Sequence, residues 1–150
     1  MKLAQALQER SDLQTRMRQL EERLRQNATV QEGETPAEDP ALLLEEYEAC
    51  AARLEELIAR INRTNSETRT EQGTITQLLA RRDVLKLRTS MYHNFLMSAS
   101  CLAQRATRSE IKIMSTVPVA EYRKKADGLS RELRELDGAI QQANWTTELL

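Results

Sequence analysis

The side chains best suited to catalysis are few and lie far apart in the sequence. His93 is the only histidine, and Cys50 and Cys101 are the only cysteines. His93 and Cys101 are eight residues apart, about 12 Å along one helix, so they cannot hydrogen-bond within it. Ser90 and Leu96 stand three residues on either side of His93, so the Glu-x-x-His motif of di-iron helical bundles is missing. The sequence predicts no catalytic residue, cofactor site or metal site, and we expect a protein that is not an enzyme.

A basic run, ARRDVLKLR from Ala80 to Arg88, is the best sequence evidence for contact with nucleic acid. Its bases could bind phosphates, but base stacking also needs exposed aromatic side chains. Tyr92 and Phe95 are the aromatic residues close by in the sequence, and we expect both to be buried. Such charges are also common on the outer face of a helix. Weak nucleic-acid binding is therefore only an alternative.

Composition bounds the class of protein. The 150 residues suit one domain, residues 1–150, and 30% of them are charged whereas 3% are aromatic. This composition is typical of long helices rather than sheets. The net charge of −1 creates no overall field that would attract nucleic acid or anionic lipid. The start of the chain lacks a signal peptide, and no apolar run approaches the roughly 20 residues that span a bilayer, so we expect a soluble cytoplasmic protein.

Hydrophobic spacing predicts an all-α fold with four helices, at about residues 2–27, 40–63, 75–106 and 118–143. In the first, second and fourth segments, apolar residues recur at intervals of three and four, which is the spacing of a heptad seam. Short connections favour antiparallel neighbours. We therefore predict an antiparallel four-helix bundle with heptad seams.

Capping signals mark the ends of these helices. Asp39 before Pro40 predicts an N-cap followed by the first helical residue, and Thr74 with Gln77 predicts a capping box. Asparagine tolerates the left-handed turn that follows a helix. We expect helices to end at asparagines, namely at Asn27, at Asn62 or Asn65, and at Asn144.

The third helical segment differs from the others because it is apolar on two sides. One stripe includes Ile75, Leu78 and Leu85, and Leu85 is about 200° around the helix axis from Leu87 of the other stripe. A helix with two apolar faces must be covered on both. We assign the second stripe to a subunit interface; its members are Val84, Leu87, Met91, Phe95 and Leu102.

The connection RSEIKIMSTVP alternates apolar and polar residues with the period of a strand. It predicts a short β element near residues 110–117, which adds Ile111 and Ile113 to the candidate interface. A lone strand leaves backbone groups unpaired and so needs a partner. The partner is either Ala28–Gln31 of the same chain or the same strand in another subunit.

Charge is unevenly distributed along the chain. Residues 31–48 hold seven acids and no bases, whereas residues 80–125 hold ten bases and three acids. Opposite charges could fix the register within or between subunits. The candidate charged contacts are Glu32, Glu34, Arg105, Arg108, Lys112 and Lys124.

The single tryptophan, Trp145, lies five residues before the last residue, where chains commonly fray. A solvated tryptophan is unusual. We expect Trp145 to be at least half buried, against the start of the first helix, the 62–75 connection or a neighbouring subunit, and we include it in the candidate interface.

Several stretches carry a family resemblance, among them KLAQALQER, NATVQEGE, LIARINRTN, LLARRD and LSRELRELDGAIQQANWTTEL. With these segments the chain resembles a family of small bacterial proteins labelled septicolysin-like. The resemblance implies a helical protein without an established biochemical role, and the label suggests a cytolysin. It assigns no catalytic residues.

These observations favour a homo-oligomeric helical protein with a structural or interaction role. The two-sided third helix, the lone strand and the segregated charge all point that way. The alternative that the family label suggests is a membrane-active protein. Biochemical activity stays unassigned.

Overall fold

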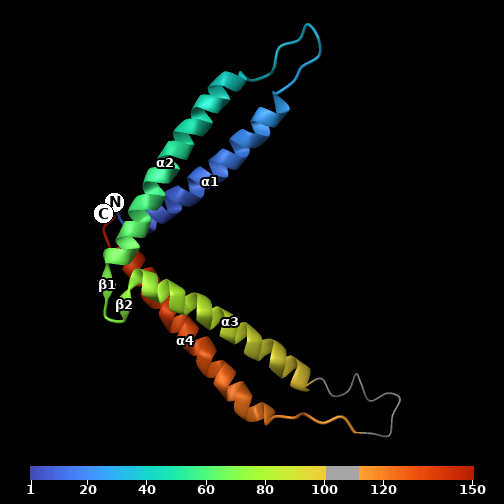
Figure 1. Ribbon diagram of the computed structural model, residues 1–150, viewed down its shortest axis with the longest axis vertical. Helices are drawn as coiled ribbons and strands as arrows, with labels where there is room; N and C mark the ends of the chain where they lie inside the picture. The colour runs from blue at the N-terminus through green and yellow to red at the C-terminus, as the bar shows by residue number, and fades with distance from the viewer. Residues whose placement is uncertain (101–111) are drawn as a thin grey trace. The chain divides into compact units, whose positions relative to one another are not determined.

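The computed structural model describes residues 1–100 and 112–150 and consists almost entirely of helices (Figure 1). The elements in chain order are α1 (Leu3–Gln26), α2 (Pro40–Glu67), β1 (Arg69–Thr70), β2 (Gly73–Thr74), α3 (Ile75–Ser100) and α4 (Val119–Thr146). The predicted all-α class with four helices and a short β element is confirmed. The starts of all four helices lie within one residue of their predicted positions.

The β element lies elsewhere than predicted. β1 and β2 form a two-stranded antiparallel hairpin between α2 and α3, with Arg69 opposite Thr74. Its turn is closed by the Thr70 hydroxyl, which donates to the Gly73 carbonyl oxygen at 2.8 Å. Residues 112–117 form no strand, and Ile111 lies outside the described residues. An alternating pattern suits a strand, but a ladder forms only where a second segment lies within hydrogen-bonding reach.

The capping predictions at the starts of α2 and α3 are confirmed. The Asp39 carboxylate accepts a hydrogen bond from the Ala41 amide at 2.9 Å, and Pro40 is the first helical residue. Thr74 and Gln77 form the reciprocal capping box, with the Gln77 amide donating to the Thr74 hydroxyl and the Thr74 amide to the Gln77 side chain. Local sequence therefore sets both helix starts.

The prediction that helices end at asparagines is confirmed for one helix and wrong for two. Asn27 caps α1 at its C-terminal end, but α2 runs past Asn62 and Asn65 to Glu67, and α4 runs past Asn144 to Thr146. In α2 the Thr64 hydroxyl is buried and accepts a hydrogen bond from the Leu150 amide, so a contact distant in sequence stabilises the extra turn. Tertiary contact thus outweighs the local stop signal.

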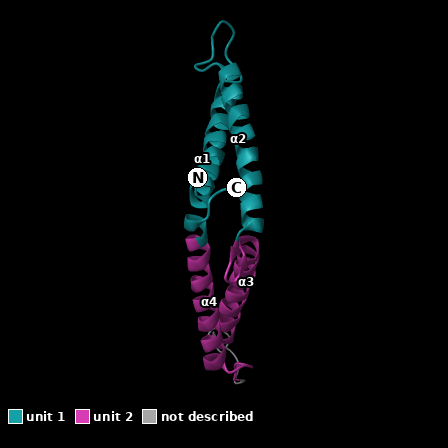
Figure 2. Cartoon of the chain, turned by 90° about the vertical axis from the view of Figure 1, so that its left-hand side faces the viewer, with its two compact units in different colours: residues 1–68, 143–150 teal, residues 69–142 magenta. Residues whose placement is uncertain are grey.

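The chain divides into two compact units, which are described here separately (Figure 2). The first unit comprises Met1–Thr68 and Ala143–Leu150, and the second comprises Arg69–Gln142. The first contains the α1–α2 pair and the last turn of α4, and the second contains the hairpin, α3 and most of α4. That residues 1–150 act as a single domain stays a prediction.

The core of the first unit follows the predicted seams. Its buried residues on the two helices are Leu3, Ala6 and Leu20 of α1 with Leu43, Leu57 and Ile61 of α2. Ion pairs also connect the two chain segments: Arg53 of α2 binds Glu9 of α1 at 2.7 Å, Arg16 of α1 binds Glu46 of α2, and Arg23 of α1 binds Glu38 just before α2. Rising numbers on one helix meet falling numbers on the other, so α1 and α2 are antiparallel.

The C-terminal tail is docked, but Trp145 does not anchor it. The Leu3 amide donates to the Thr147 carbonyl and the Leu149 amide donates to the Met1 carbonyl, both at 2.9 Å. Leu149 is buried at 8% exposure, whereas Trp145 is 66% exposed, so the prediction that Trp145 is at least half buried was wrong. Because α4 continues to Thr146, Trp145 lies about 200° around the axis from the buried Ala143.

The second unit has its core between α3 and α4. Leu78 and Leu85 of α3 pack with Leu129, Leu136 and Ile140 of α4, and Leu79, Tyr92 and Leu133 border this cluster. Except for Leu79, the α3 residues of this cluster lie on the first of the two predicted stripes. The second stripe takes no part in this core.

Candidate functional site

The second stripe of α3 is exposed and lies outside the α3–α4 core. Val84, Leu87, Met91 and Phe95 are 55%, 72%, 51% and 40% exposed. Their spacing of three, four and four residues puts them on one face of the helix, here named the α3 seam. Phe95 also meets Tyr122 of α4 edge to face, with ring centroids 6.3 Å apart. Leu102, the last residue predicted for this stripe, lies outside the described residues.

The charges beside the α3 seam are partly free. Arg81 forms an ion pair with Glu132 of α4. Arg88, one turn beyond Val84 on the same face, makes no hydrogen bond or ion pair to any described residue. The seam therefore has an unpaired guanidinium on its rim.

The remaining candidate interface and charged residues that the structure describes lie outside α3. Ile113 is 38% exposed in the segment before α4, together with the neighbouring Lys112 and Met114. Lys124 is exposed on the first turns of α4, and Trp145 is exposed near its end. Arg105, Arg108 and Ile111 lie outside the described residues.

The acidic connection between α1 and α2 is tied to its own unit. Arg23 of α1 binds Glu38, and this contact lowers the pKa of the Glu38 carboxyl. Asn27 accepts a hydrogen bond from the Glu38 amide at 3.0 Å and donates to the Arg23 carbonyl at 2.9 Å. Glu32 and Glu34, the two predicted contacts, are exposed.

The first unit carries a shallow apolar groove on the surface of α1 and α2. This α1–α2 groove has a volume of about 500 Å³ and is lined mainly by small or apolar residues: Met17, Ala51, Leu54, Ile58 and Ala59, with Glu55 and Asn62. Glu55 makes no hydrogen bond or ion pair within the part of the chain that the structure describes. The groove is thus apolar with an unpaired carboxylate in its lining.

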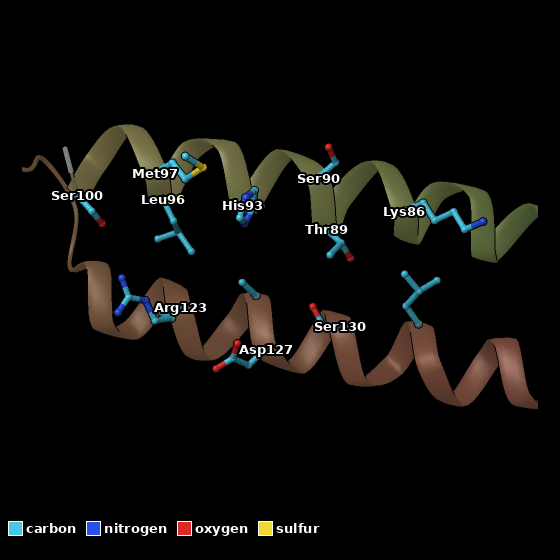
Figure 3. A pocket seen from close by; sticks show the side chains of 12 residues that line it. Lys86, Thr89, Ser90, His93, Leu96, Met97, Ser100, Arg123, Asp127 and Ser130 are labelled. Atoms are coloured by element: carbon cyan, nitrogen blue, oxygen red, sulfur yellow. The ribbon is translucent and has the colours of Figure 1, made fainter.

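A larger groove lies between α3 and α4 in the second unit, and sequence reasoning missed it (Figure 3). This α3–α4 groove has a volume of about 770 Å³. Its lining includes the charged residues Lys86, Arg123 and Asp127 together with His93, and the Thr89 hydroxyl oxygen is buried without a hydrogen-bond partner. Alternation of hydroxyls and bases along two helices is too common in sequences to have signalled such a groove.

No metal site is found in the described part of the chain. None of its His, Cys, Asp and Glu side chains form a group of three or more that could hold an ion. Cys50 is a free, partly buried thiol, and Cys101 lies outside the described residues.

Comparison with known proteins places the chain in a family. The model of a family of unknown function, DUF6847, matches residues 10–149. The chain belongs to DUF6847. It is also similar to a crystal structure described as that of a functionally unknown conserved protein from Corynebacterium diphtheriae, with 42% sequence identity and a TM-score of 0.91. That similarity covers 100% of this chain and 99% of the other, and no curated protein matches the chain.

Membership of DUF6847 corrects the resemblance drawn from sequence. The resemblance to a septicolysin-like family was wrong, because the matching family and the similar crystal structure are both described only as functionally unknown. The short charged and Leu-rich segments that carried the resemblance are common to many helical proteins. In the described residues, no helix combines the length and the apolar character needed to cross a bilayer.

Proposed function

We propose that this member of DUF6847 is a homo-oligomeric helical protein of the cytoplasm that has a structural or interaction role and is not an enzyme. The observation that carries the proposal is the α3 seam, with Val84, Leu87, Met91 and Phe95 exposed along one helical face. Exposed apolar side chains in heptad-like spacing are typical of helices that pack against a partner helix or groove.

The occupant of the seam is a second copy of this chain. The α1–α2 groove supplies a complementary surface, because Ala51 and Ala59 leave room for the larger side chains of the seam. Each copy has one seam and one groove. In a reciprocal pair, the seam of each copy would therefore occupy the groove of the other.

Rim charges support this pairing. Arg88 beside the seam is unpaired among the described residues, and so is Glu55 in the groove. Charges of opposite sign on two docking surfaces favour their encounter and fix their orientation.

A concentration series of molar-mass measurements by sedimentation equilibrium tests the proposal. We expect a mass above that of one chain at micromolar concentration, and dissociation on dilution. Leu87→Ser should weaken association roughly tenfold or more, because a side chain at the centre of an interface contributes most of the binding free energy. A mass equal to one chain at all concentrations would refute self-association.

Charge reversal tests the proposed pairing of seam and groove. Arg88→Glu and Glu55→Arg should each weaken association, and the double variant should recover most of the loss because the opposite charges are restored. Arg131→Glu, on an exposed position of α4 outside both surfaces, is the matched control. Additive losses in the double variant would show that Arg88 and Glu55 do not meet.

A further inference from the structure

The α3–α4 groove has the size and lining of a ligand site and is separate from the α3 seam. Its volume of about 770 Å³ lies within the range that holds a small organic molecule. Leu96, Ala126 and Leu133 give it an apolar lining, and Thr89, Ser90 and Ser130 add hydroxyl groups. It therefore offers both apolar contact and hydrogen bonds.

The charges of this groove are mostly basic, and those below are unpaired within the described part of the chain. Lys86, Arg123 and the Asp127 carboxylate make no hydrogen bond or ion pair to other described residues. The Arg123 guanidinium extends toward α3, whereas the Asp127 carboxylate points away from it (Figure 3). Bases that bridge α1 and α2 instead meet carboxylates, as Arg53 meets Glu9. The space between α3 and α4 thus favours an anion.

Thr89 provides an independent observation. Its hydroxyl oxygen is buried and has no hydrogen-bond partner, which costs free energy in a folded protein. In the close view Thr89 points toward α4, where Ser130 points back toward α3 (Figure 3). Lys86 lies one turn before Thr89 on α3. Two hydroxyls therefore face each other across the groove, and Lys86 lines the same end with its side chain extended along α3 away from them (Figure 3).

The rest of the groove suits an extended apolar body. Eleven residues of α3 separate Lys86 from Met97, a length of about 16 Å. Leu96 and Ala126 line this stretch, and Arg123 lies at its far end.

We propose that the α3–α4 groove binds an organic anion with an apolar body, such as an alkyl carboxylate or alkyl phosphate. The anionic group lies at the end formed by Lys86, Thr89 and Ser130. The apolar body extends along Leu96 toward Arg123.

Titration calorimetry on the full chain tests this site with octanoate, octyl phosphate and 1-octanol, each below its micelle concentration. We expect saturable binding of both anions, and the stronger of the two identifies carboxylate or phosphate as the preferred group. 1-Octanol, which has the same alkyl chain without the charge, should bind at least tenfold more weakly. Equal binding of 1-octanol, or saturation by neither anion up to millimolar concentration, would overturn the proposal.

Two substitutions locate the anion. Lys86→Gln should weaken the stronger anion about tenfold, whereas Lys125→Gln on another face of α4 should leave its affinity unchanged. Thr89→Val removes the unpartnered hydroxyl at nearly constant size, so the thermal unfolding midpoint should hold or rise while the affinity falls several-fold. Wild-type affinity in both Lys86→Gln and Thr89→Val would place the anion elsewhere and refute this site. Because the titration is independent of molar mass, its outcome is separable from that of the self-association test.

Discussion

In the first unit, Arg53 and Arg16 bind Glu9 and Glu46 on the facing helix, and Arg23 binds Glu38 just before α2. Among the described residues of the second unit, Arg81 with Glu132 is the one ion pair between α3 and α4. Lys86 and Arg123 face a groove instead. The first unit thus uses its charges to hold two helices together, and the second leaves several available to other molecules.

Apolar side chains show a similar contrast between α1 and α3. The large apolar residues of α1 are buried or partly buried, but α3 buries one stripe and exposes another. Exposed apolar area lowers the solubility of a protein unless a partner covers it. The contrast is between these two helices, since Leu42 and Leu44 of α2 in the first unit are also exposed.

Substitutions in the two stripes of α3 should give the largest difference in the free energy of unfolding. Leu85→Ala should lower the free energy of unfolding by roughly 2–5 kcal/mol, because Leu85 is buried between α3 and α4. Leu87→Ala, two residues away and exposed, should change it by less than about 0.5 kcal/mol at concentrations where the chain is dissociated. Urea unfolding measures both. Similar losses would mean that the α3 seam is covered within one chain.

A second test sharpens the account of the docked tail. Leu149→Ala should cost roughly 2 kcal/mol or more because Leu149 is buried, whereas Trp145→Ala should cost less than about 0.5 kcal/mol. Thermal unfolding of the two variants gives the comparison. Tryptophan fluorescence of the wild-type chain should resemble that of a solvated indole. A strongly blue-shifted emission that returns to the solvated position on dilution would instead place Trp145 in a subunit interface.

Acid should weaken the first unit by a small amount through its ion pairs. The hydrogen bond from Arg53 lowers the pKa of Glu9, and Lys2 lowers that of Glu148, so both carboxyls have lower pKa values folded than unfolded. Such groups stabilise the fold at neutral pH, and the stabilisation is lost as the pH falls through their folded pKa values. Amide hydrogen exchange, compared at neutral and acidic pH, should show that α1 opens faster at acidic pH. Glu9→Gln should reduce that pH dependence, and an unchanged dependence would assign it to other carboxyls.

Much of the helical framework was predictable because its causes are local. The start of α2 follows from Asp39 and Pro40, and that of α3 from the Thr74–Gln77 capping box, since each involves residues a few positions apart. The seam residues of α3 were also identified correctly as a second apolar face, because helical periodicity alone separates them from Leu85. Whether that face is an interface between copies stays a prediction.

The failures involve contacts between residues distant in sequence. The extra turn of α2 is supported by Leu150, which lies 86 residues after Thr64. The β hairpin lies where two short segments flank a tight turn between α2 and α3. It does not lie in the connection before α4, where apolar and polar residues alternate. Trp145 was misplaced because a helix end shifted by three residues turns its side chain to another face.

The sequence by itself determined the helical class, the helix starts and the faces that the helices bury, because spacing and capping act within a few residues. Only the tertiary structure decided which charges pair, how the tail docks through Leu149, and that a groove with the unpartnered Thr89 hydroxyl separates α3 from α4. These features depend on how two helices approach each other. That approach is set by side-chain packing between segments far apart in the chain, which no local pattern records.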